Sequence, residues 1–261
     1  MSRNFRSCIL LFIGLTAVAP VRALVGDIVA SSKWPGMGAI VIVFGQEYIT
    51  CTATLIAPQW VLTAAHCLDL GGQPMFTTNM INVGSGVTYY TSDLVILDPD
   101  YVPGVDLSGN DVALVHFANP LPVVPFRLEN DSSRVHLADS FYIVGYGQTV
   151  VGPEGSNDNT LRMTGLASIS AIGEKELQSN SGVHPCFGDS GAPWFVKFSD
   201  GFPLVIATQS HIDGNCDSIS YADPTADVMA FIIAHVPDLC LRDTVGAPCE
   251  GIFRDGIDGQ Y

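Results

Sequence analysis

Three short motifs, spread over most of the chain, constrain its fold more than any other feature of the sequence. They are Thr63-Ala64-Ala65-His66-Cys67, Asp111-Val112-Ala113-Leu114 and Gly188-Asp189-Ser190-Gly191-Ala192-Pro193. A serine hydroxyl is a poor nucleophile at neutral pH unless a base takes its proton and an anion orients that base. We therefore expect a fold that brings the side chains of His66, Asp111 and Ser190 together.

The amino-terminal segment is typical of a secretory signal peptide. Two arginines precede a mostly apolar run, 8–21, which is shorter than the roughly 20 residues that span a bilayer. The small-residue sites Ala17-Val18-Ala19 and Val21-Arg22-Ala23 follow as candidate cleavage positions. The sequence therefore predicts a secreted protein whose residues 1–23 form a signal peptide with, at most, a very short propeptide.

The cysteines indicate an oxidising compartment. Removal of the signal peptide would leave six of them: Cys51, Cys67, Cys186, Cys216, Cys240 and Cys249. An even number in a secreted chain indicates three disulfides. Six thiols allow 15 pairings, so counting alone does not assign the bridges.

Most of the remaining chain is predicted to form short strands separated by Gly, Pro, Asn and Asp, which is typical of an all-β barrel or sandwich. One helix is predicted near Asp227–His235, where Val228, Phe231 and Ile232 form an apolar stripe. A proline-rich stretch, Asn119–Glu129, lies between two strand-rich halves. The predicted strands are Ala39–Phe44, Tyr48–Ile56, Leu94–Leu97, Val112–Phe117, Phe141–Tyr146, Leu161–Ser170, Ala192–Phe198 and Leu204–Ser210.

In order and spacing, the three motifs resemble those of the chymotrypsin-like (trypsin-family) serine peptidases, and the resemblance extends from residue 24 to residue 235. It implies an all-β fold in which two six-stranded antiparallel β-barrels pack together with a C-terminal helix. The chain would then comprise the signal peptide (1–23), an N-terminal barrel (24–124), a C-terminal barrel (125–225), the C-terminal helix (226–242) and a C-terminal extension (243–261).

The resemblance also implies a role for each motif residue. His66 would be the general base, Asp111 would orient its imidazole, and Ser190 would be the nucleophile that forms an acyl-enzyme. The backbone N–H groups of Gly188 and Ser190 would form the oxyanion hole. The expected activity is that of a secreted serine endopeptidase. A catalytically silent peptidase-like binding protein, and an esterase with the same triad, remain as alternatives.

The first residues after the signal peptide suggest how the protein becomes active. Leu24-Val25-Gly26-Asp27 resembles the Ile-Val-Gly-Gly sequence with which mature family members begin. The resemblance implies that the freed amine of Leu24 pairs with Asp189, because a buried carboxylate is costly unless it is paired. Cleavage after Ala23 would expose this amine directly. Cleavage after Ala19 would instead leave a zymogen with a tetrapeptide still to be removed.

The disulfide pairs also follow from the resemblance. The first pair would close the loop of the histidine motif, and the second would tie the nucleophile loop to the strand that shapes the substrate pocket. The third pair is assigned only by elimination. The implied pairs are Cys51–Cys67, Cys186–Cys216 and Cys240–Cys249.

The residues that the resemblance assigns to the substrate pocket differ from those of trypsin. They are His184, Pro185, Ser210, His211, Ile212 and Ile219. A trypsin-type enzyme has aspartate where this chain has His184, so we expect no preference for Arg or Lys. Ser210 would keep a backbone contact to an extended substrate. The branched side chains of Ile212 and Ile219 would favour small aliphatic residues. A protonated His184 or His211 would instead favour an acidic residue, and a third outcome is neither preference.

The expected partners follow from charge and from the resemblance. The net charge of −15 argues against nucleic acid and anionic membranes. His184 and His211 lack a complete set of metal ligands, and the segment between Gly84 and Ile96 is too short for the family's acidic calcium loop. We therefore expect no cofactor or metal, no nucleic acid, and no membrane partner after signal removal. The expected protein is a monomer that acts on proteins or peptides, with proteinaceous inhibitors as a further candidate class of partner.

Overall fold

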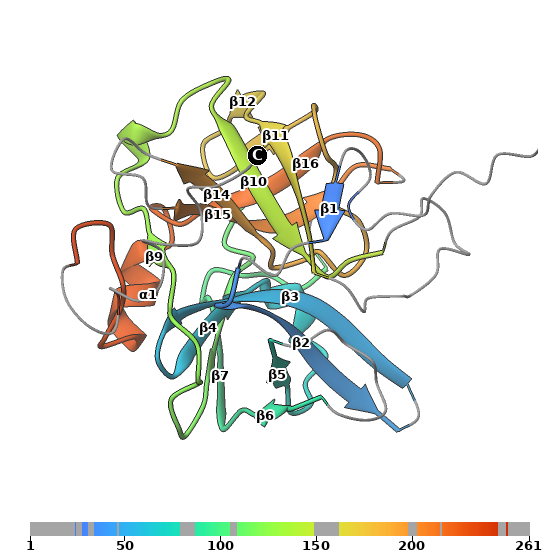
Figure 1. Cartoon of the computed structure of the whole chain (residues 1–261), viewed down its shortest axis with the longest axis vertical. Helices are drawn as coiled ribbons and strands as arrows, with labels where there is room; N and C mark the ends of the chain where they lie inside the picture. Colours follow the sequence, from blue (N-terminus) through green and yellow to red (C-terminus); the bar gives the residue numbers. More distant parts are fainter. Residues whose placement is uncertain are drawn as a thin grey trace, which may run out of the picture.

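The computed structural model of the chain describes residues 24, 28–30, 34–45, 47–78, 87–104, 109–148, 162–197, 203–214, 216–244 and 249. The predicted signal peptide, and most of the predicted C-terminal extension, lie outside these residues. The described chain forms two curled β-sheets and a C-terminal helix, which confirms the predicted fold class (Figure 1). Within the described ranges, no helix is both long enough and apolar enough to cross a membrane.

The first sheet holds seven antiparallel strands in the order β6-β5-β2-β3-β4-β8-β7 and lies at the bottom of Figure 1. Its longest strand, β3, pairs with β2 over the whole length of β2. The carboxyl-terminal half of β3 is buried, because that half faces both the sheet's own core and the second sheet. The strands are β2 (Met37–Phe44), β3 (Glu47–Ala57), β4 (Trp60–Thr63), β5 (Met75–Thr77), β6 (Tyr90–Thr91), β7 (Leu94–Leu97) and β8 (Ala113–His116).

The second sheet holds nine strands, eight of them in the order β1-β11-β10-β14-β15-β16-β13-β12. The ninth, β9, runs parallel to β15, and the other pairs are antiparallel. The two sheets have more strands than the six per barrel expected, because several strands are only two or three residues long. The strands are β1 (Ile28–Ala30), β9 (Arg127–Leu128), β10 (Ser140–Gly145), β11 (Met163–Ser168), β12 (Ala171–Ile172), β13 (Leu177–Ser179), β14 (Pro193–Lys197), β15 (Pro203–Ile212) and β16 (Ser220–Pro224).

The amino-terminal strand joins the two halves of the protein. β1 precedes the first sheet in the sequence but pairs with β11 of the second, with Ile28 opposite Gly165. One strand of the range 24–124 therefore belongs to the second sheet. The predicted division into barrels at 24–124 and 125–225 stays a prediction.

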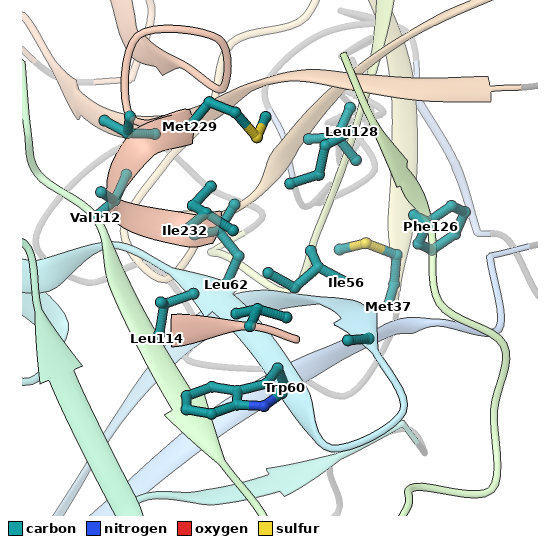
Figure 2. Close-up of a cluster of buried hydrophobic side chains, with 14 of the residues drawn as sticks. Met37, Ile56, Trp60, Leu62, Val112, Leu114, Phe126, Leu128, Met229 and Ile232 are labelled. Carbon is teal, nitrogen blue, oxygen red and sulfur yellow. The ribbon is translucent and has the colours of Figure 1, made fainter. Parts of the chain in front are cut away.

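A shared hydrophobic core fixes the two sheets relative to each other (Figure 2). Trp34 stacks on Phe195 of β14, with ring centroids 4.6 Å apart. The helix α1 (Met229–His235) covers this core with Met229 and Ile232, and Val228 caps its amino end. Removing a large side chain from such a core costs about 3–5 kcal/mol. The packing therefore sets the distance between catalytic candidates that come from different sheets.

Candidate active site

His66 lies in a 3₁₀ turn, Ala65–Cys67, directly after β4. The antiparallel pairing of β4 with β8 places Thr63 opposite Ala113, so the residues just beyond these ends also meet. The backbone N–H of His66 donates to Oδ1 of Asp111 at 2.9 Å, and Nδ1 of its ring lies 2.7 Å from Oδ2. Strand register therefore brings the predicted base and the predicted anion together.

Asp111 is fully buried and accepts hydrogen bonds from three donors. Two come from His66, and the third comes from the hydroxyl of Ser210, whose Oγ lies 2.6 Å from Oδ2. Because this carboxylate can only accept, it fixes the His66 tautomer with the proton on Nδ1. Nε2 is then left as an acceptor.

Ser190 lies in the loop between the Cys186 disulfide and β14. Its Oγ lies 2.8 Å from Nε2 of His66, so the three predicted side chains form one continuous hydrogen-bonded chain. The carbonyl of Ser190 accepts a hydrogen bond from the backbone N–H of Thr52 at 2.8 Å. The hydroxyl of Thr52 donates to the carbonyl of Gly188 at 3.0 Å. A residue of β3 therefore holds the serine loop in place, a role that the sequence analysis did not assign.

The Phe187–Gly188 and Asp189–Ser190 peptides are held by their carbonyl groups. The carbonyl of Phe187 accepts from the N–H of Gln148 at 2.7 Å, and the carbonyl of Asp189 accepts from the N–H of Ala192 at 2.8 Å. In a planar trans peptide, the C=O and the following N–H point in opposite directions. The N–H groups of Gly188 and Ser190 are therefore directed away from these partners. Gly188 has φ +97°, a conformation that favours glycine.

The side chain of Asp189 is fully buried. Oδ1 accepts from the N–H of Gly147 at 2.8 Å, and Oδ2 accepts from the N–H of Cys186 at 2.9 Å. Burial raises the pKa of Asp189 to about 7, although both hydrogen bonds lower it. Leu24 is also fully buried, in the core of the second sheet with Trp194. The carboxyl is thus costly to ionise in the uncut chain, where the nitrogen of Leu24 is an amide.

The described cysteines form three disulfides. Two join the pairs that the resemblance implies, Cys51–Cys67 and Cys186–Cys216, and the third is Cys240–Cys249, the pair assigned by elimination. The first joins β3 to the turn that holds His66. The second joins the segment before Ser190 to the connection between β15 and β16. Both bridges therefore brace segments that carry site residues.

The predicted pocket residues lie on two segments that the Cys186 disulfide connects. Ile212 ends β15 and lies opposite Ser220 of β16. Ile219 directly precedes Ser220 in the chain. The ring of His211 stacks on Tyr221, with centroids 4.3 Å apart. Pro185 is buried on the other segment, where His184 is half-buried. Nδ1 of His184 has no hydrogen-bond partner among the described residues.

The part of the chain that the structure describes contains no group of three His, Cys, Asp or Glu residues that could hold a metal ion. The sequence analysis gave Ser210 a backbone role toward substrate, whereas the structure shows its side chain on Asp111. Neither Thr52 nor the hydroxyl of Ser210 carries a local sequence signal, because their partners are remote in the chain.

Comparison with known proteins identifies relatives of this chain. Residues 25–232 match the sequence model of the family described as trypsin. The chain is 25% identical over 235 residues to ovochymase of Halocynthia roretzi, an alignment that covers 81% of this chain and 14% of that protein. It is 25% identical over 258 residues to serine protease 28 of Mus musculus, covering 86% of this chain and 92% of that protein. The chain thus spans a small part of the first relative and most of the second.

Proposed function

This chain belongs to the trypsin family of serine proteases, and from that premise we propose that it is a secreted endopeptidase that uses His66, Asp111 and Ser190. One observation carries the proposal. A hydrogen-bonded chain runs from Oδ2 of Asp111 through the imidazole to Oγ of Ser190, with distances of 2.7 and 2.8 Å. At these distances a base can take a hydroxyl proton as the hydroxyl attacks.

The proposed reaction proceeds through an acyl-enzyme. Oγ of Ser190 forms a bond to the scissile carbonyl carbon while its proton passes to Nε2 of His66. Asp111 stabilises the imidazolium that results. The C–N bond then breaks, and His66 returns the proton to the leaving amine. A water molecule hydrolyses the ester by the same proton transfers, which releases the carboxylic acid and restores Ser190.

The N–H groups of Gly188 and Ser190 would stabilise the oxyanion of each tetrahedral intermediate. The orientation of the Phe187–Gly188 and Asp189–Ser190 peptides supports this role. A donor of this kind is worth about 3–4 kcal/mol in the transition state. Thr52 would support the hole indirectly, because it hydrogen-bonds to the carbonyls of Gly188 and Ser190 and so holds the loop that carries the two N–H groups.

Activation would depend on a new amino terminus at Leu24. Cleavage before this residue would convert its nitrogen into an ammonium group that could pair with Asp189. The burial of both residues supports the pairing, because an ion pair would offset the cost of a buried carboxylate. Sequencing the amino terminus of the secreted, active protein tests this proposal. Active protein that begins at any other residue would rule the pairing out.

Two features of the pocket bear on substrate choice. The half-buried side chains of Ile212 and Ile219 support a preference for small aliphatic residues. The buried Nδ1 of His184, which has no hydrogen-bond partner among the described residues, supports the alternative, an acidic residue. Neither feature suits Arg or Lys. A cleavage profile on a proteome-derived peptide library would separate the two preferences, and cleavage mainly after Arg or Lys would contradict both.

Secretion is supported by the three disulfides, which persist in oxidising compartments. Protein or peptide substrates follow from the family. The monomeric state and the inhibitor class of partner are proposals that sedimentation and inhibitor titration can test.

A fluorophosphonate probe tests the central proposal without knowledge of the substrate. We expect covalent labelling of Ser190 in the processed protein and at least about a thousandfold slower labelling in His66→Ala. His136→Ala is the matched control, because His136 is exposed and remote from the site. Failure of the correctly processed protein to label would favour the binding-protein alternative. Turnover of esters without any turnover of peptides would favour the esterase.

A further inference from the structure

A second acidic side chain lies buried beside Asp111. Asp223 belongs to β16 and pairs in register with Thr208 of β15, two residues before Ser210. Its side chain is 1% exposed. The backbone N–H of Asp111 hydrogen-bonds to its carboxyl group. Oδ2 of Asp223 has no hydrogen-bond partner among the residues that the structure describes.

The two neighbouring carboxyl groups differ in their donors. Asp111 accepts from the backbone N–H and the ring of His66 and from the hydroxyl of Ser210, whereas Asp223 accepts from one backbone N–H. The charge of Asp111 acts on Asp223, and two like charges that interact in a buried site cannot both form without a large cost. Asp111, which accepts more hydrogen bonds, therefore carries the charge.

The surroundings of Asp223 also favour its neutral form. Burial, and then the charge of Asp111, raise the pKa of Asp223 well above its ordinary value, against the lowering effect of the hydrogen bond from Asp111. Glu176, just before β13, and Asp98, just after β7, add to the rise. His66 is already paired with Asp111. The cation Lys175, next to Glu176, donates to Oδ1 of Asn110 at 3.1 Å and is not among the main causes of the shift.

We propose that Asp223 is a positioning residue for Asp111 and acts as a neutral carboxylic acid. One of its oxygens accepts the N–H of Asp111 and so fixes the backbone from which the catalytic carboxylate extends. Its retained proton leaves Asp111 as the single negative charge next to His66. The inference rests on the proposed function, because it takes Asp111 to be the anion of the triad.

If Asp223 is neutral in the folded protein, it makes the free energy of unfolding depend on pH, which a polar residue that does not titrate would not do. In the unfolded chain an aspartate ionises near pH 3.9. If the folded protein keeps this proton, the free energy of unfolding falls as the pH rises above about 4, because the unfolded state then binds fewer protons. Asparagine has the same shape and the same acceptor oxygen but no proton to lose. Asp223→Asn should therefore become more stable than the wild type as the pH rises.

The test compares Asp223→Asn, Asp223→Ala and the exposed control Asp238→Asn in the processed protein. The readouts are the rate constant for fluorophosphonate labelling of Ser190 between pH 5 and pH 9 and the thermal midpoint at pH 4.5 and pH 8. We expect Asp223→Ala to lose at least about tenfold in labelling rate, and Asp223→Asn to recover most of that loss. We also compare the thermal midpoint of Asp223→Asn with that of the wild type at each pH. We expect this difference, variant minus wild type, to be at least about 3 °C larger at pH 8 than at pH 4.5. Asp238→Asn should follow the wild type in both measurements.

Two results would overturn the proposal. If Asp223 carried a charge, its removal in Asp223→Asn would destabilise the imidazolium, and the acidic midpoint of the pH–rate curve would move down by about 0.5 unit or more. Labelling of Asp223→Ala at the wild-type rate would show that the residue positions nothing. If Asp223→Ala does not fold, the two pH measurements on Asp223→Asn decide. If the wild type itself does not label, the proposed function fails, while the thermal comparison still decides whether Asp223 is neutral.

Discussion

The backbone N–H of Thr52 donates a 2.8 Å hydrogen bond to the carbonyl oxygen of Ser190, which joins the first sheet to the loop of the predicted nucleophile. The hydroxyl of the same residue donates to the carbonyl of Gly188 and accepts from the N–H of Tyr146, each at 3.0 Å. One fully buried side chain of β3 thus connects two loops of the second half of the protein. The position of Ser190 relative to His66 depends on this connection.

Thr52→Val should impair both stability and reactivity. Valine has the shape of threonine but leaves the carbonyl of Gly188 and the N–H of Tyr146 without their partner. We expect a loss of about 1–3 kcal/mol in the free energy of unfolding, and about tenfold slower fluorophosphonate labelling of Ser190. Thr50→Val is the matched control on the same strand, because Oγ1 of Thr50 has no partner among the described residues. Equal labelling rates in the two variants would contradict the role of Thr52.

Ser210→Ala should slow the reaction while the fold stays intact. The variant removes the 2.6 Å hydrogen bond to Asp111, and a hydrogen bond to a charged group contributes about 1.5–3 kcal/mol. We expect the labelling rate of Ser190 to fall by about tenfold or more. Ser220→Ala, on the neighbouring strand, is the control, because its buried hydroxyl lacks a partner within the described ranges. A wild-type rate in Ser210→Ala would show that Asp111 is held in place without the hydroxyl of Ser210.

The uncut chain should lose stability as the pH rises, in part through Asp189. Burial raises the pKa of Asp189 to about 7 in the folded protein, whereas an unfolded aspartate ionises near 3.9. The contribution of this group is fully present below about pH 4 and is lost as the pH rises to about 7. The thermal midpoint of Asp189→Asn minus that of the uncut wild type should therefore be about 5–10 °C larger at pH 8 than at pH 4. The difference should shrink in protein that begins at Leu24, where an ammonium group can pair with the carboxylate. A pH-independent difference in the uncut chain would contradict this account.

The disulfides should differ in their effect on the site. Replacing Cys186 and Cys216 by alanine should destabilise the protein by about 2–5 kcal/mol and slow the labelling of Ser190, because this bridge braces the serine loop. Replacing Cys240 and Cys249 removes a bridge that closes a shorter loop, with a separation of 9 residues. We expect that second variant to lose stability but to label at the wild-type rate once folded. Active-site titration at a temperature where both variants are folded provides the measurement. Equal slowing of Ser190 labelling in both variants would show that the loss does not depend on which disulfide is removed.

Several elements could be predicted because their signals are local. Long apolar runs gave the strands that became β2, β3 and β15, and an i, i+3, i+4 stripe gave the helix, which begins at Met229 rather than at Asp227. Among the shorter strands, β7 and β8 were predicted, whereas several others were missed. β16, with the sequence SYADP, has two non-polar side chains beyond its tyrosine and resembles a turn. Its pairing with β15 and β13 makes it a strand, and that pairing is remote in sequence.

The sequence by itself determined which chemical groups the protein carries: a histidine, an aspartate and a serine in distinctive motifs, together with paired cysteines. Only the tertiary structure decided which other groups hydrogen-bond to these residues or lie beside them. The hydroxyl of Ser210 turns toward Asp111, Thr52 holds the serine loop, and Asp223 faces a like charge in a buried site. The physical reason is that a motif records residue types along the chain. Hydrogen bonding, desolvation and charge repulsion depend on distances in space, which strand register and the shared core set.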